Sequence, residues 1–353
     1  MSTSTIAIPV QTQWDGDVIG DLGDHFLAGT GMHGPVDATR FAELTRRHRR
    51  ELHVYCYRML GSFDAAEDHV QEVFLRAWRA RDTFEARSSA RTWLYRIATN
   101  ACLDTLRRTV PPVQPYPDQL LDERPGPDAQ AVGRETMSLA FLAAIQLLPP
   151  RQRAALILRD VLSWSAGETA ALLGTSVPAA NSALQRARAT LRGRWPGGRL
   201  EWAPAGEPGR EERELLRRYI DAHERADPEA LIGLLREDVR LTIEPGVGEW
   251  TGRPAVAEAL RRDMNTPGRW RMLPTAANRQ PAAAAYVRAD GDPAFRPFAL
   301  IVLRPVAGLL TAMDAFEAPG LFPVFGLPAS LDPEAPAGDL RPTAPSGDLP
   351  ARG

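Results

Sequence analysis

The clearest pattern of hydrophobic and polar positions lies between residues 64 and 80. Apolar residues recur there at i, i+3, i+4, i+7 and i+8, namely Val70, Val73, Phe74, Ala77 and Trp78. This spacing puts them on one face of an amphipathic helix. The other faces carry Asp68, Gln71, Glu72, Leu75 and Arg79. A lone leucine among acidic and amide side chains is typical of a residue that docks on a partner helix, although isolated exposed leucines are also common.

Two further helical patterns flank this one. Phe41–Leu60 and Arg91–Arg108 each carry apolar residues along one side, and Gly61 and a polar loop ending at Ala90 separate the three segments. We therefore expect residues 38–108 to form one all-helical domain. Residues 109–133 contain six prolines in a polar context, which predicts an extended linker rather than part of a core.

Helical patterns resume at residue 134 and run to residue 194. The last of them, Ser165–Arg192, reads as two short helices joined by a tight turn, with a capping-box pair at Ser165 and Glu168 and a helix-ending glycine at Gly174. In the second helix one face is apolar, and the others carry Asn181, Ser182, Gln185, Arg186, Arg188 and Arg192. This is a helix-turn-helix pattern, typical of proteins that bind the DNA major groove. The alternative is an αα-hairpin whose arginine face is merely solvated.

The character of the chain changes after a second linker at residues 195–211. Residues 212–235 read as two helices and 254–262 as another, whereas Val239–Glu244, Ala284–Arg288, Phe298–Leu303 and Leu310–Phe316 read as strands. Helices followed by a run of antiparallel strands predict an α+β domain over residues 212–327. The two ends, residues 1–37 and 328–353, show no sustained period, and we expect them to be disordered.

Composition narrows the class of protein. The 353 residues have 44% hydrophobic and 24% charged content and a formal net charge of −2, which is ordinary for a soluble protein of two or three domains. All basic residues of the Lys+Arg class are arginine, a choice that suits phosphate and guanine recognition but that codon bias also explains. We expect Cys56 and Cys102 to be buried free thiols, with no metal site and no cofactor. A signal peptide and a membrane span are not predicted, so we expect a cytoplasmic protein.

Three motifs in order resemble the sigma-70 family of RNA polymerase factors, of the extracytoplasmic-function type. Residues 64–78, DAAEDHVQEVFLRAW, resemble the helix that binds the clamp helices of the polymerase β′ subunit. Residues 88–108, SSARTWLYRIATNACLDTLRR, resemble the segment that reads and opens the −10 element. Residues 148–191 resemble the domain that reads the −35 element. The resemblance implies sigma region 2 over residues 38–108 and sigma region 4 over residues 134–194, with core RNA polymerase (through its β′ clamp helices and β flap) and promoter DNA as partners.

The resemblance also implies roles for individual residues. Asp68, Gln71, Glu72 and Leu75 would face core polymerase. The −10 strand would be contacted by Phe84, Ser88, Arg91, Arg96, Asn100 and Arg107, and a loop at residues 84–90 would sit over a base flipped out of the duplex. Ser182, Gln185, Arg186 and Arg188 would read the −35 element as duplex. An opened −10 strand needs a basic track that accepts single strand, whereas the −35 element needs only a major-groove helix.

Residues 212–327 resemble the SnoaL-like domain, a cone-shaped α+β fold related to nuclear transport factor 2. The matching segments are residues 249–260, 273–288 and 312–328. The family allows a regulatory module, a ligand sensor or an enzyme. His223 and Asp314 are candidate ligand-binding residues, with Asp221 and Glu317 as further cavity acids, but the sequence pairs none of them as an acid and a base. We expect His223 to be a packed core histidine, the domain to be no enzyme, and its role to be intramolecular contact with the sigma domains.

Three hypotheses follow. The first is a sigma factor with a built-in regulator. The second is a DNA-binding regulator that works without polymerase and carries a small-molecule receptor domain, which would bind duplex DNA tightly unaided. The third is an enzyme in the C-terminal domain, whose turnover would depend on Asp314 or His223.

Overall fold

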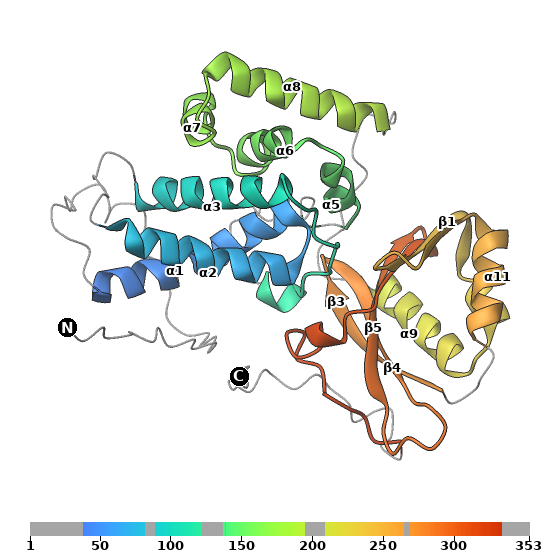
Figure 1. The fold of residues 1–353 in the computed structure, drawn as a ribbon. Helices are drawn as coiled ribbons and strands as arrows, with labels where there is room; N and C mark the ends of the chain where they lie inside the picture. Colours follow the sequence, from blue (N-terminus) through green and yellow to red (C-terminus); the bar gives the residue numbers. More distant parts are fainter. Residues whose placement is uncertain are drawn as a thin grey trace.

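The computed structural model describes residues 38–81, 89–121, 137, 139–194, 209–264 and 269–333. These residues form two helical units and a C-terminal domain built on a sheet (Figure 1). The predicted disorder at residues 1–37 lies outside this range, as do residues 195–208 of the linker predicted over 195–211. The linker prediction is wrong for residues 210 and 211, which belong to a helix. None of the helices in the described part of the chain combines the length and the apolar character that a membrane span requires.

The first helical unit contains α1 (Ala38–Leu60), α2 (Phe63–Arg79) and α3 (Ala90–Leu106). The apolar stripe predicted for α2 is buried, with Val70, Val73 and Ala77 all at 0% exposure. Ser62 caps α2 by accepting a hydrogen bond from the Ala65 amide, and Ser89 caps α3 in the same way. Gly61 joins α1 to α2 with a φ of +77°, and a Cβ there would lie 2.4 Å from the Gln146 side chain, so both backbone conformation and space favour glycine.

The second helical unit contains α5 (Leu139–Gln146), α6 (Pro150–Leu156), a π-helical turn η4 (Ile157–Val161), α7 (Ala166–Leu172) and α8 (Val177–Arg194). Within the helical stretch predicted over residues 134–194, α6 is followed directly by η4. The capping box of Ser165 and Glu168 is present, and Gly174 has the left-handed φ of +58° that the turn needs. The stripe on α8 is buried, at 3% exposure for Ala180, 4% for Leu184 and 6% for Leu191. The helix-turn-helix prediction is confirmed.

The C-terminal domain has a six-stranded sheet in the order β2-β1-β6-β5-β4-β3. The strands are β1 (Leu235–Glu244), β2 (Gly248–Thr251), β3 (Trp270–Ala277), β4 (Gln280–Val287), β5 (Arg296–Val306) and β6 (Leu309–Phe316). The prediction of purely antiparallel strands is wrong for one pair, because β1 and β6 run parallel. Two strands, β2 and β3, were missed, since β2 has only four residues and β3 is interrupted by Pro274.

Helices α9 (Arg210–Glu224), α10 (Pro228–Ile232) and α11 (Arg253–Asp263) belong to a core on one face of this sheet, and we call that face the inner face. Alternate strand residues such as Met272, Ile301 and Met313 belong to this core. Their neighbours Leu273, Leu300 and Val302 belong instead to a second core, which continues into both helical units. A mixed sheet with helices on one face confirms the expected α+β domain.

The Pro-rich linker is the main correction to the sequence analysis. Its described part, residues 109–121, is not a solvated spacer, because Tyr116 is 1% exposed and Pro115, Pro117 and Asp118 are also buried. A short 3-10 turn, η3 (Asp118–Leu120), follows Tyr116. The predicted tail likewise begins later than residue 328, since Leu331 is buried and bridges Phe295. Proline prevents regular structure but does not prevent burial, and sequence alone gave no contact partner for either segment.

Candidate nucleic-acid interface and partner surface

The predicted partner surface lies on the exposed side of α2. Asp68, Gln71 and Leu75 are exposed and Glu72 is half-buried. Leu75 is 41% exposed, and Glu72 forms an ion pair with Arg76 at 2.6 Å. About two successive turns of one helix thus present an apolar side chain beside acidic and amide groups, which is the chemistry that was expected to contact a partner helix.

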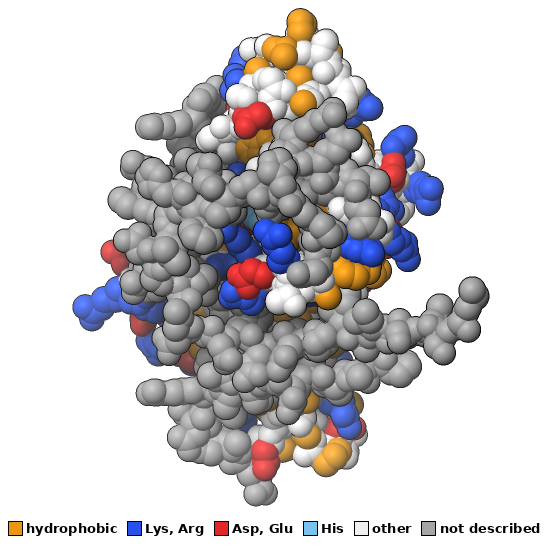
Figure 2. All heavy atoms as spheres, turned by 90° about the vertical axis from the view of Figure 1, so that its left-hand side faces the viewer, with side chains coloured by type: hydrophobic (Ala, Val, Ile, Leu, Met, Phe, Trp, Pro, Cys, Tyr) orange, Lys and Arg blue, Asp and Glu red, His pale blue; other side chains and the backbone are white. Residues whose placement is uncertain are grey.

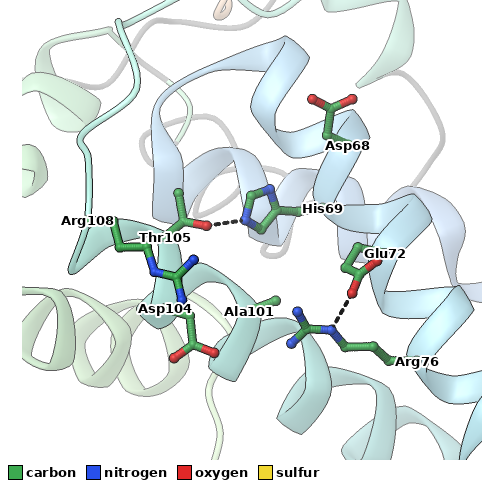
Figure 3. Close-up of a pocket in the computed structure, with 8 residues that line it drawn as sticks. All are labelled: Asp68, His69, Glu72, Arg76, Ala101, Asp104, Thr105 and Arg108. Atoms are coloured by element: carbon green, nitrogen blue, oxygen red, sulfur yellow. Dashed lines mark hydrogen bonds and ion pairs between the residues drawn. The ribbon is translucent and has the colours of Figure 1, made fainter.

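A groove of about 280 Å³ runs between α2 and α3 beside this surface (Figure 3). Asp68, Glu72 and Arg76 line it from α2, Asp104 and Thr105 line it from α3, and Arg108 lines it from the turn after α3. His69 closes its floor by bridging the two helices, with its Nε2 2.8 Å from the Thr105 hydroxyl and its Nδ1 2.7 Å from the Ala65 carbonyl oxygen. The groove therefore extends the charged surface of α2 onto α3.

The residues predicted to contact the −10 strand do not all lie together. Arg96, Asn100 and Arg107 are exposed on α3, and their spacing of four and seven residues places them on one face of the helix. Arg107 pairs with Asp104 on the same helix. Phe84 and Ser88 lie outside the described residues. The first unit thus carries a basic and amide track along one face of α3.

Arg91 points elsewhere. Its Nε lies 2.9 Å from the Glu51 carboxylate on α1, and its guanidinium lies 5.1 Å from the centre of the Tyr95 ring and 5.6 Å from the centre of the Trp164 ring. Trp164 belongs to the second helical unit and packs on Tyr95 with ring centres 5.1 Å apart. Arg91 is therefore part of the contact between the two helical units, a role that its position in the motif did not indicate.

The helix-turn-helix presents three of its four predicted DNA-contacting residues to solvent. Ser182, Gln185 and Arg186 are exposed on α8. Arg188 is half-buried, and its two guanidinium nitrogens lie 2.9 and 2.6 Å from the two carboxylate oxygens of Asp160 in η4. Such a bidentate pair fixes the orientation of the guanidinium. On the face shown in Figure 2, which includes the N-terminal end of α3, arginine side chains gather near the centre and toward the right-hand edge.

The two helical units are locked together by Arg153 of α6, which is 2% exposed. Its guanidinium donates to the Met59 carbonyl oxygen at 2.5 Å and to the Gln146 side chain at 2.6 Å. A second nitrogen donates to the Gln146 carbonyl oxygen at 2.9 Å. Arg153 thereby joins the end of α1 to the end of α5, and burial lowers its pKa to about 10, which leaves the side chain charged at neutral pH.

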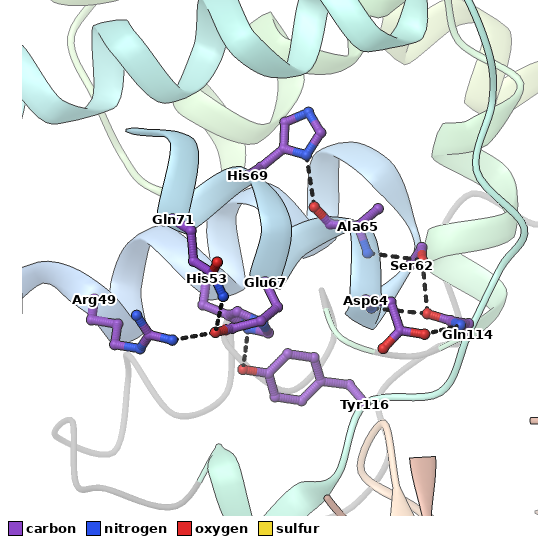
Figure 4. Close-up of polar contacts among 10 residues, drawn as sticks. All are labelled: Arg49, His53, Ser62, Asp64, Ala65, Glu67, His69, Gln71, Gln114 and Tyr116. Atoms are coloured by element: carbon purple, nitrogen blue, oxygen red, sulfur yellow. Dashed lines mark hydrogen bonds and ion pairs between the residues drawn. The ribbon is translucent and has the colours of Figure 1, made fainter. Parts of the chain in front are cut away.

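A polar cluster anchors the linker on the first unit (Figure 4). His53 is buried and lies between the Tyr116 hydroxyl, at 2.9 Å, and the Glu67 carboxylate, at 3.6 Å. Burial lowers the pKa of His53 to about 3, so the imidazole is neutral at physiological pH. Gln114 accepts from the Ser62 hydroxyl at 2.7 Å and donates to the Asp64 carboxylate at 2.9 Å. The beginning of the linker is thus fixed against α1 and α2.

The two candidate ligand residues of the C-terminal domain lie on opposite faces of the sheet. His223 belongs to the inner face, where its ring packs 5.6 Å from that of Trp270, and burial lowers its pKa to about 4. Asp314 alternates with the inner residues Met313 and Ala315, so it points to the other face, where Arg240 and Arg304 lie 3.8 and 3.7 Å away. Burial raises the pKa of Asp314. The two residues cannot act as one acid–base pair.

Sequence reasoning missed the contact between the C-terminal domain and the linker. Asn278, in the turn between β3 and β4, is 0% exposed and bonds to Tyr116 through both its backbone and its side chain. The available signal was an asparagine between two apolar runs, because asparagine tolerates the left-handed backbone conformation of a tight hairpin turn. That signal predicts the turn but not its burial.

Family comparisons agree with this architecture. The sigma-70 region 2 family matches residues 44–110, and the sigma-70 region 4 family matches residues 138–191. The extracytoplasmic-function (ECF) RNA polymerase sigma factor SigG of Mycobacterium tuberculosis is 40% identical over 334 residues, which cover 86% of this chain and 89% of SigG. The chain belongs to the ECF sigma factors of the sigma-70 family.

Two further relatives show how much of the chain is shared with other sigma factors. The ECF sigma factor SigM of Mycobacterium tuberculosis is 34% identical over 45% of this chain and 79% of SigM. The crystal structure of SigJ from the same organism covers 83% of this chain and 100% of the SigJ chain with a TM-score of 0.55 at 22% identity, which shows a shared fold. This sigma factor thus binds core RNA polymerase and promoter DNA and directs transcription initiation.

Proposed function

We propose that this sigma factor contacts the β′ clamp helices of core polymerase through Asp68, Gln71, Glu72 and Leu75 of α2. The exposed Leu75 beside the groove between α2 and α3 is the observation that carries the assignment. An exposed leucine surrounded by acidic and amide groups supplies an apolar anchor with a charged rim, which is the composition of a partner-binding patch. The second helical unit would engage the β flap.

Promoter recognition is divided between the two helical units. Ser182, Gln185, Arg186 and Arg188 of α8 read the −35 element as duplex, and Arg96, Asn100 and Arg107 of α3 hold the opened −10 strand together with Phe84 and Ser88. Arg91 joins this set only after it leaves Trp164. Unstacking a base costs a few kcal/mol, so the track on α3 must favour single strand over duplex.

The arrangement of the two units supports regulation of promoter binding. The centres of the −35 and −10 elements are about 25 base pairs apart, which is roughly 85 Å of B-form DNA. Here the units touch, with Arg153 of one bonded to Met59 of the other at 2.5 Å. We therefore propose that this compact arrangement is the inactive form, that core polymerase separates the units, and that the C-terminal domain opposes the separation without catalysing a reaction.

Run-off transcription with core polymerase tests the assignment. The full-length protein should direct initiation from a promoter with matched −35 and −10 elements, and Gln185→Ala should weaken initiation only where the −35 element is present. Free protein should bind duplex promoter DNA weakly. Tight unaided binding to duplex DNA, without any initiation by core polymerase, would favour a regulator that acts independently of polymerase.

A further inference from the structure

The turn between β3 and β4 is an unusual hairpin tip because it is buried. Asn278 and Arg279 form it with φ values of 56° and 60°, the left-handed conformation that a two-residue hairpin turn requires. Hairpin tips are normally on the surface, yet the Asn278 side chain is 0% exposed. Asparagine tolerates this backbone conformation well, but the turn alone does not explain why its amide group is enclosed.

The amide of Asn278 bonds to the linker on both sides of residues 122–136. Its Oδ1 accepts from the Tyr116 backbone amide at 2.8 Å. Its Nδ2 donates to the Met137 carbonyl oxygen at 2.7 Å and to the Tyr57 hydroxyl of α1 at 2.9 Å. The backbone amide of Asn278 also donates to the Tyr116 carbonyl oxygen at 2.9 Å. One side chain thus joins the linker's beginning, the linker's end and the first helical unit.

Neighbouring contacts extend this attachment. Pro117 forms an antiparallel bridge with Ala277 at the end of β3. The Arg279 backbone amide donates to the Asp118 carboxylate at 2.7 Å, and its guanidinium donates to the Leu121 carbonyl oxygen at 3.2 Å. The hairpin tip therefore binds Tyr116 and Pro117 as a short extended peptide, by contacts of the kind that join a peptide to a sheet edge. Arg279 then holds the η3 turn that follows them.

We propose that Asn278 is a staple that closes the interdomain linker into a loop and so keeps the second helical unit against the first. A linker of about 20 extended residues can span roughly 65 Å, but with Tyr116 and Met137 bonded to one amide group its two ends stay side by side. Separation of the units then requires that the hairpin tip leave the linker. This inference rests on the proposed function, because it names the contact through which the C-terminal domain opposes separation.

The chemistry makes the contact all-or-none. The Tyr116 amide, the Met137 carbonyl and the Asn278 amide are shielded from water, so a partly broken contact would leave buried polar groups unpaired, which is unfavourable. Full withdrawal lets water satisfy each of them. The staple is thus a two-state element. In the closed state the Asn278 side chain keeps all its hydrogen bonds, and in the open state water binds the linker groups instead.

The test uses full-length protein with spin labels on Thr39→Cys of α1 and Thr190→Cys of α8, both exposed positions. Asn278→Gly keeps the left-handed turn and removes only the amide group. Ala307→Gly is the matched control, because Ala307 has a φ of 50° in the exposed turn between β5 and β6. Asn278→Asp is a second variant, which keeps an acceptor for Tyr116 but replaces both Nδ2 donors with a carboxylate oxygen that would face the Met137 carbonyl oxygen.

Wild-type protein and Ala307→Gly should give one short distance between the labels. Asn278→Gly should shift the open-to-closed ratio about tenfold or more toward long distances. Asn278→Asp should shift the ratio at least as far, because it buries a carboxylate against a carbonyl oxygen. Both variants should direct more run-off transcription at limiting core polymerase. Identical distance distributions for wild type and both Asn278 variants would overturn the staple. If core polymerase fails to open even the wild-type protein and no variant supports transcription, the proposed function fails instead.

Discussion

The Arg91 guanidinium of α3 lies 5.6 Å from the centre of the Trp164 ring, across the contact between the two helical units. Arg91 was assigned to the −10 strand from its motif, yet in this compact form it is held by Glu51, Tyr95 and Trp164. Arg91 can therefore contact the second helical unit or DNA, but not both at the same time.

This relationship predicts two effects of Arg91→Ala. The substitution removes the cation–π contacts and the ion pair, which together contribute about 1 kcal/mol at a half-exposed site. The population with the two helical units apart should therefore rise about fivefold, as measured by the distance between spin labels on α1 and α8. Open-complex lifetime on promoter DNA should fall as well. Arg96→Ala is the control, since Arg96 lies on the other face of α3 and should change open-complex lifetime while leaving the distance between the units unaltered. Unaltered distances in Arg91→Ala would contradict the assignment.

The bidentate pair between Arg188 and Asp160 predicts that Asp160 modulates −35 binding. Asp160→Asn removes the competing carboxylate and leaves the guanidinium free to contact phosphate or a base, so duplex affinity should rise and the salt dependence should steepen by about one counterion. Arg188→Ala should do the reverse. Fluorescence anisotropy with −35 duplex at several salt concentrations measures both, and Asp238→Asn, which breaks an Arg–Asp pair in β1, is the control. If log affinity falls with log salt concentration at the same slope for wild type and all three variants, Arg188 stays outside the DNA interface.

Leu75→Ala should weaken binding to core polymerase about tenfold or more, because an apolar anchor in a partner patch typically contributes above 1 kcal/mol. Its melting temperature should stay close to that of wild type, since Leu75 is 41% exposed. Leu309→Ala, at 37% exposure in β6, removes the same side chain away from α2 and should leave binding unchanged. Pull-down of core polymerase with calorimetry of each variant provides the measurement, and a binding loss equal in both variants would argue against a specific anchor.

The buried histidines predict acid sensitivity. Burial lowers the pKa of His53 to about 3 and that of His223 to about 4 from the usual 6.5. Both take up a proton more readily when unfolded, so the free energy of unfolding is highest above pH 6.5 and falls as pH drops from 6.5 toward about 3. The loss from His53 is on the order of a few kcal/mol, although Glu67 and Arg49 face the same imidazole and modify it.

Denaturant unfolding at pH 7 and pH 5 checks this expectation. His53→Gln removes the titrating group and should reduce the difference in unfolding free energy between the two pH values. His223→Gln should do the same for unfolding of the C-terminal domain. If His53→Gln retains the full wild-type difference, the acid sensitivity comes from other groups.

Local patterns were sufficient for most of the helices and for the family. The stripe on α2, the capping box at Ser165 and the glycine turn at Gly174 are each determined by residues a few positions apart, and the structure confirms all three. The strand positions of β1, β5 and β6 also follow from alternation. The direction of β1 relative to β6 does not, because pairing between strands some 70 residues apart leaves no local trace.

The sequence by itself determined which side chains are available: the arginine face of α8, the polar track of α3 and the leucine of α2. Only the tertiary structure decided which of them are engaged. It turned Arg91 and Arg188 toward Trp164 and Asp160, separated His223 from Asp314 across the sheet, and buried Tyr116 and Asn278 together. The physical reason is that a propensity acts over a few residues, whereas burial of a polar group depends on partners that only the folded chain brings within hydrogen-bond distance.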